Sequence, residues 1–347
     1  MNHASEVKRA TVSLGRRLVG LVPFAAVLAM PAVSQAQVVA GNTAVLQVLD
    51  DGGIINPTTV AVRDGVAFVA EGQLGRFGQV GGFFQAVTVD LNGGGLLDDA
   101  ILLRDSDFFP EGITLDPVTN DLFIGSLFDG TIVKVPNGSL TPEIFADEIP
   151  NALTRGAVGL KVDNVNNLLW ACDSTLDPAR PGATLTGLSL VDASVVVTHE
   201  FAGANDFCND IAIDAAGNVF VTETVVGQVL TIDAANVLTA NSLEVFVASP
   251  GIAANGGFGA NGLALTGGAL FVANTTAGTI VRFDPAAADV AATEQIVVIT
   301  EGDVANTVLS GPDGLLALSD TEVLVVENGL FGAGLNRLVK LTFDPLQ

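Results

Sequence analysis

The sequence predicts an all-β protein built from six copies of one repeat, and three observations support this. Helical periodicity is nearly absent, whereas short strands with alternating or β-branched residues recur along the chain. Turns such as AAGN at residues 215–218 separate these strands. The whole unit, with four strands, returns after about fifty residues, a period typical of propellers. We therefore predict a six-bladed β-propeller.

The first 36 residues have the composition of a secretory signal peptide. Four basic residues precede an apolar stretch from residue 18 to residue 30, and the small-residue sequence SQA ends at Ala36. An uncleaved membrane anchor is the alternative, but the apolar stretch contains Pro23 and is short against a span of about 20 residues. We expect cleavage after Ala36, a single propeller domain over residues 37–347, and a secreted or periplasmic protein.

The chain is acidic, with 14 Lys and Arg against 38 Asp and Glu and a net charge of −24 at pH 7. Such a surface repels nucleic acid and anionic lipid, so we expect neither nucleic acid nor a membrane as a partner. The simplest role of this charge is the solubility of an exported monomer. Since 49% of the residues are apolar and no later segment is long enough to span a bilayer, we expect a large buried core.

The ends of the chain are predicted to pair and close the ring. The fourth repeat shows the full set of strands, at residues 211–214, 218–223, 228–233 and 243–249. The sixth repeat lacks its outer strand, because the chain ends soon after LVKLTF at residues 338–343. The segment TAVLQVLD at residues 43–50 precedes the first repeat and can fill this vacancy. Such pairing leaves no long unpaired inner edge.

One position at the start of each first strand aligns in all six repeats. Its members are Thr59, Gly112, Gly159, Asp210, Gly262 and Gly314, at intervals of 53, 47, 51, 52 and 52 residues. The residues immediately before them are Thr58, Glu111, Val158, Asn209, Asn261 and Asp313. In a propeller these residues surround the central channel. Glu111 and Asp313 would supply two negative charges there, and Asn209 and Asn261 two neutral carbonyls, a set suited to Ca²⁺ or another divalent cation.

A simpler explanation of this pattern is turn conformation. Asn, Asp and Gly are common wherever a chain turns, so Asn–Gly or Asp–Gly before a strand needs no ligand. Glu111 is poorly explained in this way, because Glu is not a turn residue. Two carboxylates across a narrow channel would also repel each other, and a dication would remove that repulsion. The metal site and the turn both remain open at this point.

Further polar residues end the second strands, which return to the same face of the ring. They are Glu71, Ser126, Asp173, Glu223, Asn274 and Glu327. We expect them at the rim of the site, where they could orient a hydroxylated substrate or act as alternative bases. For each one alone, a solvated rim or a loop hydrogen bond is the simpler explanation. Asp210 follows Asn209 directly and is predicted to support the ligands from behind.

The few cysteines and histidines of the chain argue against zinc, redox and histidine chemistry. Cys172 and Cys208 could form a disulfide that closes a loop of 36 residues in an oxidising compartment, or remain two buried thiols. There is no CxxC or Cys/His cluster, so zinc and redox chemistry have no support. His199 is the only histidine after the predicted signal peptide, and it lies in a predicted outer strand, SVVVTHEF, far from the axis. We therefore do not expect histidine catalysis.

The repeats resemble a known family. PEGITLDPVTNDLFIGSLFDGTI, NDIAIDAAGNVFVTET, ANGLALTGGALFVANTTAGTIVRFD and PDGLLALSDTEVLVVEN look like repeats of the senescence marker protein/gluconolactonase (LRE-like) family of six-bladed, calcium-dependent β-propellers, over nearly all of the mature chain. In that family a Glu, two Asn and an Asp hold a catalytic dication. The resemblance implies these roles for Glu111, Asn209, Asn261 and Asp313, with Asp313 also acting as base or nucleophile. Here the Glu belongs to the second repeat, whereas the family usually has it in the first, and paraoxonase-type histidines are missing.

These observations lead to two hypotheses from different classes. The first is a secreted Ca²⁺-dependent hydrolase of lactone or ester type, in which the cation polarises a carbonyl of a small-molecule substrate and activates water. The alternative is a non-catalytic exported propeller that binds a ligand or protein partner and holds a structural metal ion. The rim loops contain no diagnostic motif, so the sequence does not identify the substrate.

Overall fold

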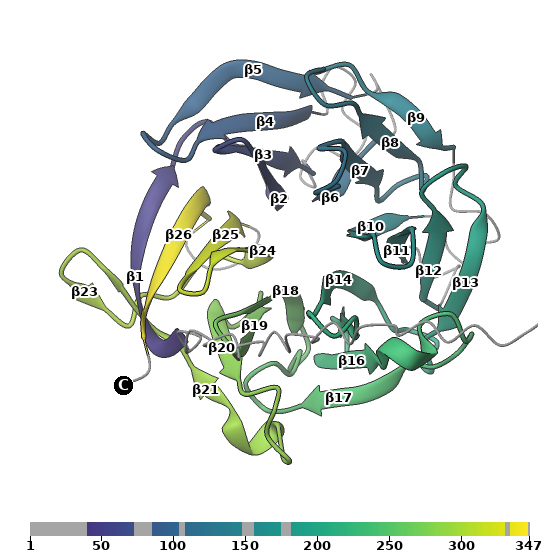
Figure 1. Ribbon diagram of the computed structural model, residues 1–347. Helices are drawn as coiled ribbons and strands as arrows, with labels where there is room; N and C mark the ends of the chain where they lie inside the picture. Colours follow the sequence, from purple (N-terminus) through teal and green to yellow (C-terminus); the bar gives the residue numbers. More distant parts are fainter. Residues whose placement is uncertain are drawn as a thin grey trace, which may run out of the picture. The chain divides into compact units, whose positions relative to one another are not determined.

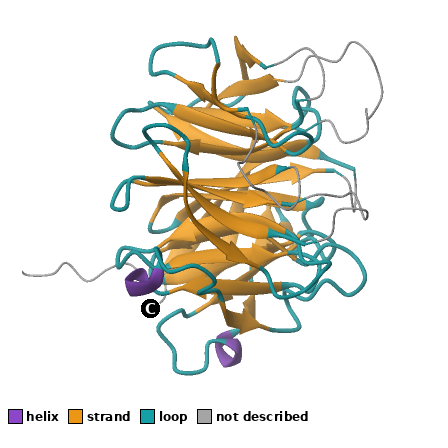
Figure 2. Cartoon of the chain, turned by 90° about the vertical axis from the view of Figure 1, so that its right-hand side faces the viewer, coloured by secondary structure: helices purple, strands orange, loops and turns teal. Residues whose placement is uncertain are grey.

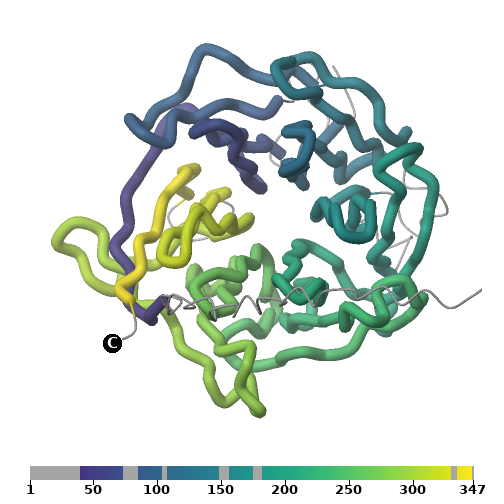
Figure 3. The backbone as a smooth tube through the Cα atoms, viewed as in Figure 1, coloured from purple at the N-terminus to yellow at the C-terminus, as the bar shows by residue number. Residues whose placement is uncertain are grey.

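Each repeat folds into one antiparallel sheet, and the six sheets stand as blades around a common centre (Figure 1). The computed structural model describes residues 40–72, 85–103, 108–147, 156–174, 182–329 and 334–345. The predicted signal peptide lies outside these residues. The backbone passes from the first blade to the sixth in sequence order (Figure 3). The six-bladed β-propeller predicted from the repeats is therefore confirmed.

The first five blades each contain four strands, numbered from the channel outward. Blades 1 and 2 consist of β2 (Pro57–Arg63), β3 (Val66–Glu71), β4 (Gln85–Asp90) and β5 (Leu96–Leu102), then β6 (Pro110–Leu115), β7 (Leu122–Ser126), β8 (Ile132–Val135) and β9 (Glu143–Ala146). Blade 3 consists of β10 (Ala157–Asp163), β11 (Leu168–Asp173), β12 (Thr184–Ser189) and β13 (Val195–Glu200). Blades 4 and 5 consist of β14 (Cys208–Ile213), β15 (Val219–Glu223), β16 (Gln228–Ile232) and β17 (Glu244–Ala248), then β18 (Ala260–Thr266), β19 (Ala269–Asn274), β20 (Thr279–Phe283) and β21 (Gln295–Ile296).

Strands account for nearly all of the regular structure in the described residues (Figure 2). The helical elements there are two short 3₁₀ turns, η2 (Ala234–Asn236) and η3 (Ala291–Thr293). In the part of the chain that the structure describes, no helix has the length and apolar character needed to cross a membrane.

The sixth blade is closed by the two ends of the chain. Its strands run outward from β24 (Pro312–Ser319) through β25 (Glu322–Asn328) and β26 (Asn336–Pro345) to β1 (Ala40–Asp50). β1 is antiparallel to β26, with Val45 opposite Thr342 and Leu46 opposite Leu341. The purple and yellow strands of Figure 1 therefore lie side by side, as predicted for residues 43–50.

Two strands outside β1 were not predicted. β22 (Val298–Glu301) pairs in parallel with the outer edge of β1, and β23 (Val304–Ala305) pairs with β22. Sheet hydrogen bonds thus also cover the outer edge of β1. Strands of four and two residues carry too little alternation to be distinguished from a loop in the sequence.

The core lies between neighbouring blades, where each sheet packs its apolar faces on the next. Trp170 of β11 is fully buried among aliphatic residues of blades 3 and 4. Between blades 5 and 6, the ring centroids of Phe271 and Phe343 are 4.4 Å apart. A disulfide joins Cys172 of β11 to Cys208 of β14, with their Cα atoms 5.2 Å apart. Of the two states that the sequence left open, the structure has the bridge, and it links blade 3 to blade 4.

Candidate metal centre

A β-bulge interrupts the start of every inner strand. The register shifts between the first residue and the third residue after it, as between Pro110 and Ile113 in β6 and between Pro312 and Leu315 in β24. The same shift occurs in the other four blades. Each bulge contains the two aligned residues of its repeat, including Glu111 and Asp313. Bulges redirect side chains and are common beside active sites, and here one occurs wherever a ligand was predicted.

The glycines of the aligned position are required by close packing between blades. A Cβ on Gly112 would overlap the carbonyl oxygen of Val158, and one on Gly262 would overlap that of Asp313. Neither glycine has a positive φ. Turn conformation therefore does not explain these two glycines. The same close approach brings the inner strands together around the channel.

Three of the four predicted ligands line one small cavity. Glu111 of β6, Asn209 and Asp210 of β14, and Asp313 of β24 line a space of about 10 Å³. A space of that size holds a single water-sized particle or ion. Asn261 of β18 is 5% exposed, and its side chain lies close enough to Asp313 to lower the pKa of that carboxyl group. All four predicted ligands and Asp210 therefore lie at one end of the channel.

Burial and mutual repulsion raise the pKa values of these carboxyl groups. Burial is the largest cause for Glu111, whose pKa is raised well above its usual value, and the charges of Asp313 and Asp210 raise it further. The pKa of Asp313 is raised to about 7, mainly by burial and also by the charge of Asp210. Burial raises the pKa of Asp210 to about 6. Three carboxyl groups share a space from which water is largely excluded, an arrangement that favours a bound cation.

The donor atoms available at this point suit a hard dication. Asn261 Oδ1 is buried and has no hydrogen-bond partner in the described part of the chain. The carboxyl group of Glu111 likewise makes no hydrogen bond to the residues that the structure describes. Carboxylate and amide oxygens are the ligands that Ca²⁺ prefers. No group of three or more His, Cys, Asp or Glu with metal-binding geometry occurs among the described residues, so the three carboxyl groups do not by themselves form such a group.

Asp210 is held by the backbone. Its Oδ1 accepts a hydrogen bond from the N–H of Ile211 at 2.8 Å, and its Oδ2 accepts one from the N–H of Leu263 at 2.9 Å. Asp210 thereby ties β14 to β18 and places a third carboxyl group at the cavity. This position fits the supporting role expected from the sequence.

Two polar residues that the sequence analysis missed hold the ligands from the side. Thr275 Oγ1 lies 2.9 Å from Asn261 Nδ2, and Asn328 Nδ2 donates to Asp313 Oδ2 at 2.7 Å. Thr275 and Asn328 occupy one position of the repeat, directly after the residue that pairs with the first residue of the inner strand. This position holds Gly72, Leu127, Ser174, Thr224, Thr275 and Asn328 in the six repeats, so no common residue type marks it in the sequence.

The residues predicted for the rim are buried and bonded within the fold. Each lies opposite the first residue of its inner strand, as Glu71 does with Pro57. The carboxyl group of Glu71 accepts the N–H of Ile55 at 2.7 Å, and that of Glu223 accepts the N–H of Phe207 at 3.1 Å. These bonds fix the chain where it enters the inner strand. Desolvation is the main cause that raises the pKa of Glu223.

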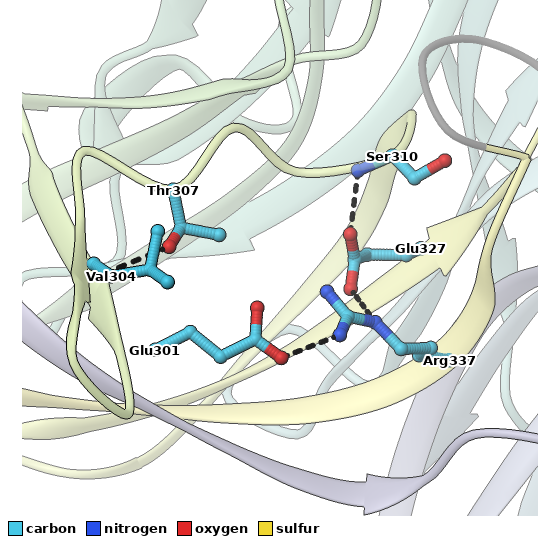
Figure 4. Close-up of polar contacts among 6 residues, drawn as sticks. All are labelled: Glu301, Val304, Thr307, Ser310, Glu327 and Arg337. Carbon is cyan, nitrogen blue, oxygen red and sulfur yellow. Dashed lines mark hydrogen bonds and ion pairs between the residues drawn. The ribbon is translucent and has the colours of Figure 1, made fainter.

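The other members of this set are also bonded. Ser126 Oγ accepts the N–H of Phe109 at 3.3 Å, and Glu327 accepts the N–H of Ser310 at 2.5 Å (Figure 4). Asn274 Nδ2 donates to the carbonyl oxygens of Gly251 and Ala253 at 3.0 and 3.2 Å. Asp173 accepts the hydroxyl of Thr184 at 3.5 Å. Loop and strand hydrogen bonds account for the burial of these side chains, and a role toward substrate stays a prediction.

Lys161 is a charged channel residue that the sequence analysis did not single out. It lies on β10 and, with Asp210, lines a second cavity of about 360 Å³ that continues along the channel between mostly aliphatic walls. Both cavities are lined by Asp210 and Leu160, so they adjoin. Desolvation lowers the pKa of Lys161, and the charge of Asp210 opposes this effect. Alanine or threonine occupies this position in four of the other repeats, which makes the lysine visible in an alignment.

His199 lies outside the channel, as predicted. It is buried on the outer strand β13, where its Nε2 lies 3.3 Å from the carbonyl oxygen of Val237 and its Nδ1 accepts the N–H of Ser242 at 3.1 Å. Desolvation lowers its pKa. These contacts describe a neutral structural imidazole.

Comparison with solved structures places this chain among six-bladed propellers. A luciferin-regenerating enzyme matches with a TM-score of 0.63 and 13% identity over 86% of this chain and 95% of that chain. A PQQ-bound aldose sugar dehydrogenase from Streptomyces coelicolor matches with a TM-score of 0.57 and 14% identity over 88% and 100%. Virginiamycin B lyase from Staphylococcus aureus matches with a TM-score of 0.55 and 12% identity over 86% and 99%.

These likenesses establish the class of protein, a six-bladed β-propeller whose structural neighbours include enzymes. At such identities they show the fold alone. No protein-family model matches the sequence, and no curated protein matches it.

Proposed function

We propose that this protein is a secreted or periplasmic hydrolase of lactone or ester type that depends on Ca²⁺ or a similar dication. The observation that carries the proposal is the convergence of Glu111, Asn209 and Asp313 on one ion-sized cavity at the end of the channel, with Asn261 beside Asp313. The resemblance of the repeats to calcium-dependent propeller enzymes supports it. The predicted signal peptide supports the location.

The four residues would hold the cation with two charges and two neutral oxygens. When bound, such an ion would polarise the carbonyl of a lactone or ester and lower the pKa of a water molecule beside it. Asp313 lies at the cavity with one carboxyl oxygen held by Asn328, and we assign it the acceptance of the proton from the attacking water. The carboxyl group of Asp210, fixed by two backbone N–H groups, would add negative charge that favours a cation.

Metal analysis of the native protein, followed by assays on lactones, aryl esters and phosphotriesters, tests the proposal. We expect one divalent ion per chain, hydrolysis of lactones or aryl esters, and loss of both ion and activity on treatment with a chelator. Glu111→Gln should abolish activity, whereas Glu244→Gln, on the exposed face of β17, should not.

Each outcome discriminates between hypotheses. Purified protein with no divalent ion and no thermal shift on addition of calcium would remove the proposal. Protein that binds calcium but hydrolyses no member of the panel would support the other hypothesis, a propeller that binds a ligand or partner around a structural ion.

A further inference from the structure

The amide of Asn261 lies between two partners that determine how it is turned. Its Nδ2 is 2.9 Å from Thr275 Oγ1, and its side chain lies close enough to the carboxyl group of Asp313 to lower the pKa of that group. Thr275 Oγ1 in turn lies 2.9 Å from the carbonyl oxygen of Pro312. Asn261 and Thr275 are 5% and 2% exposed, so water does not compete for these contacts.

The chemistry of the three groups allows one arrangement. A threonine hydroxyl has one proton, and a carbonyl oxygen can only accept, so the proton of Thr275 goes to Pro312. Thr275 Oγ1 must then accept from Asn261, which requires the NH₂ group of the amide at this contact. The remaining atom, Asn261 Oδ1, is the one left buried without a partner in the described residues.

We propose that Thr275 is a positioning residue that holds Asn261 with its carbonyl oxygen free for a cation beside Asp313, and that it thereby sets the affinity of the site for calcium. This inference rests on the proposed metal-dependent function. It explains why a buried amide oxygen lacks a partner, which is otherwise a cost to the fold. Residues that orient metal ligands commonly affect metal affinity in this way.

Blade 4 offers a matched control at the same position of the repeat. Thr224 Oγ1 donates to the carbonyl oxygen of Ala260 in the next blade at 2.7 Å, as Thr275 donates to Pro312 in its next blade. Thr224 makes no side-chain bond to Asn209 in the part of the chain that the structure describes. Replacing Thr224 with valine therefore removes the bond between blades alone, whereas replacing Thr275 with valine also releases Asn261.

The experiment measures calcium binding by titration calorimetry of the full mature protein after chelator treatment, with thermal unfolding of each variant as the measure of folding. We expect Thr275→Val to raise the Kd for Ca²⁺ about 10- to 100-fold, and Thr275→Ser, which keeps the hydroxyl, to restore it to within about threefold of the original value. Thr224→Val should also lower the unfolding temperature, because it loses the same bond between blades, yet leave the Kd within about threefold.

Failure of this inference differs from failure of the proposed function. If the unmodified protein binds calcium and Thr275→Val binds it as tightly as Thr224→Val does, the positioning role is wrong and the metal site stands. If Thr275→Ser loses affinity as Thr275→Val does, the hydroxyl is not the group that matters, and the inference is wrong. If the unmodified protein binds no divalent ion, the proposed function itself is wrong.

Discussion

Arg337 and Glu327 form a buried ion pair on neighbouring strands of blade 6. Arg337 Nε lies 2.7 Å from Glu327 Oε2, and the two side chains are 8% and 0% exposed. Arg337 Nη1 lies 2.8 Å from Oε1 of Glu301, which belongs to β22 (Figure 4). A single guanidinium group therefore joins the strands of the closing blade to the additional strand outside β1.

Loss of Arg337 should destabilise the ring strongly. Arg337→Met leaves the carboxylate of Glu327 buried without its cation, and breaking such a pair costs about 3 to 5 kcal/mol of unfolding free energy. Lys340→Met is the control, because Lys340 and Glu322 form a more exposed pair at 3.1 Å that contributes about 1 kcal/mol or less. Denaturant unfolding monitored by the fluorescence of Trp170 measures both. Equal effects of the two substitutions would contradict the structural role of Arg337.

The disulfide between blades 3 and 4 should contribute substantially to stability. It closes a loop of 36 residues, which corresponds to about 3 to 4 kcal/mol in the chain-entropy treatment. Cys172→Ala combined with Cys208→Ala should lower the unfolding free energy by about this amount, because both side chains are fully buried and the blades contact each other around them.

Thiol titration of the denatured, unreduced protein gives an independent check on the bridge. It should find no free thiol before reduction and two afterwards, since Cys172 and Cys208 are the cysteines of the chain. Reactive thiols before reduction would show that the bridge does not form.

Replacing Gly262, which packs against the backbone of the next blade, should reduce both stability and calcium affinity. Gly262→Ala places a Cβ against the carbonyl oxygen of Asp313, so the inner strands of blades 5 and 6 must move apart. We expect a loss of about 1 to 3 kcal/mol in unfolding free energy, as for overpacked cores, together with weaker calcium binding. Gly52→Ala serves as the control, because a Cβ there meets nothing within 4 Å and its φ is not positive. A Gly262→Ala protein with unchanged calcium affinity would contradict the link between this packing and the site.

The positive charge of Lys161 should weaken the binding of a cation at the channel end. Its ammonium group lies in the channel near Asp210, which is next to the predicted ligand Asn209. Lys161→Met removes this positive charge, so calcium should bind several times more tightly, most clearly at low ionic strength. Lys134→Met is the control, because Lys134 is partly exposed and lies 4.0 Å from Asp121, away from the channel lining. Calorimetric titration in low salt measures both variants, and unchanged affinity for Lys161→Met would remove the predicted charge effect.

The sequence predicted the ring and its closure because these depend on features repeated many times. Glycine or aspartate occupies the aligned position in five of the six repeats, and alternation in the strands recurs with the same register. The missing outer strand of the sixth repeat stands out against this pattern. The β22–β23 hairpin had no such support, since its pairing depends on a free edge of β1 and on the ion pair of Glu301. Local pattern carries little information about contacts of that kind.

The site was predictable to the extent that its residues share one register. Glu111, Asn209, Asn261 and Asp313 could be aligned, and the bulges bring them together. Thr275 follows the end of a strand, where a threonine signals nothing in particular. Glu71 was predicted at the rim from a similar alignment, yet its carboxylate accepts a backbone hydrogen bond within its own blade. The sequence does not distinguish a carboxylate bonded in this way from one that faces the cavity.

The raised pKa values at the channel end make the stability of the metal-free protein depend on pH. The pKa of Asp313 is about 7 in the folded protein against 3.8 for the ordinary group, that of Asp210 is about 6, and that of Glu111 is raised as well. The folded chain therefore binds more protons than the unfolded chain between about pH 4 and pH 7. This contribution to stability is fully present below the unfolded pKa values and is lost as the pH rises through the folded ones.

Thermal unfolding of the metal-free protein between pH 4 and pH 8 should show this loss, and calcium should reverse it. Because protons and Ca²⁺ compete for the same carboxylates, added calcium should raise the unfolding temperature clearly at pH 8 and little at pH 5. Asp313→Asn removes one of the titrating groups. The unfolding temperature of this variant without metal should therefore fall less steeply with pH than that of the unmodified protein. The other acidic residues affect both proteins alike. If the two proteins show the same pH dependence without calcium, Asp313 does not titrate in this range, and the crowding of carboxylates inferred at the channel end is wrong.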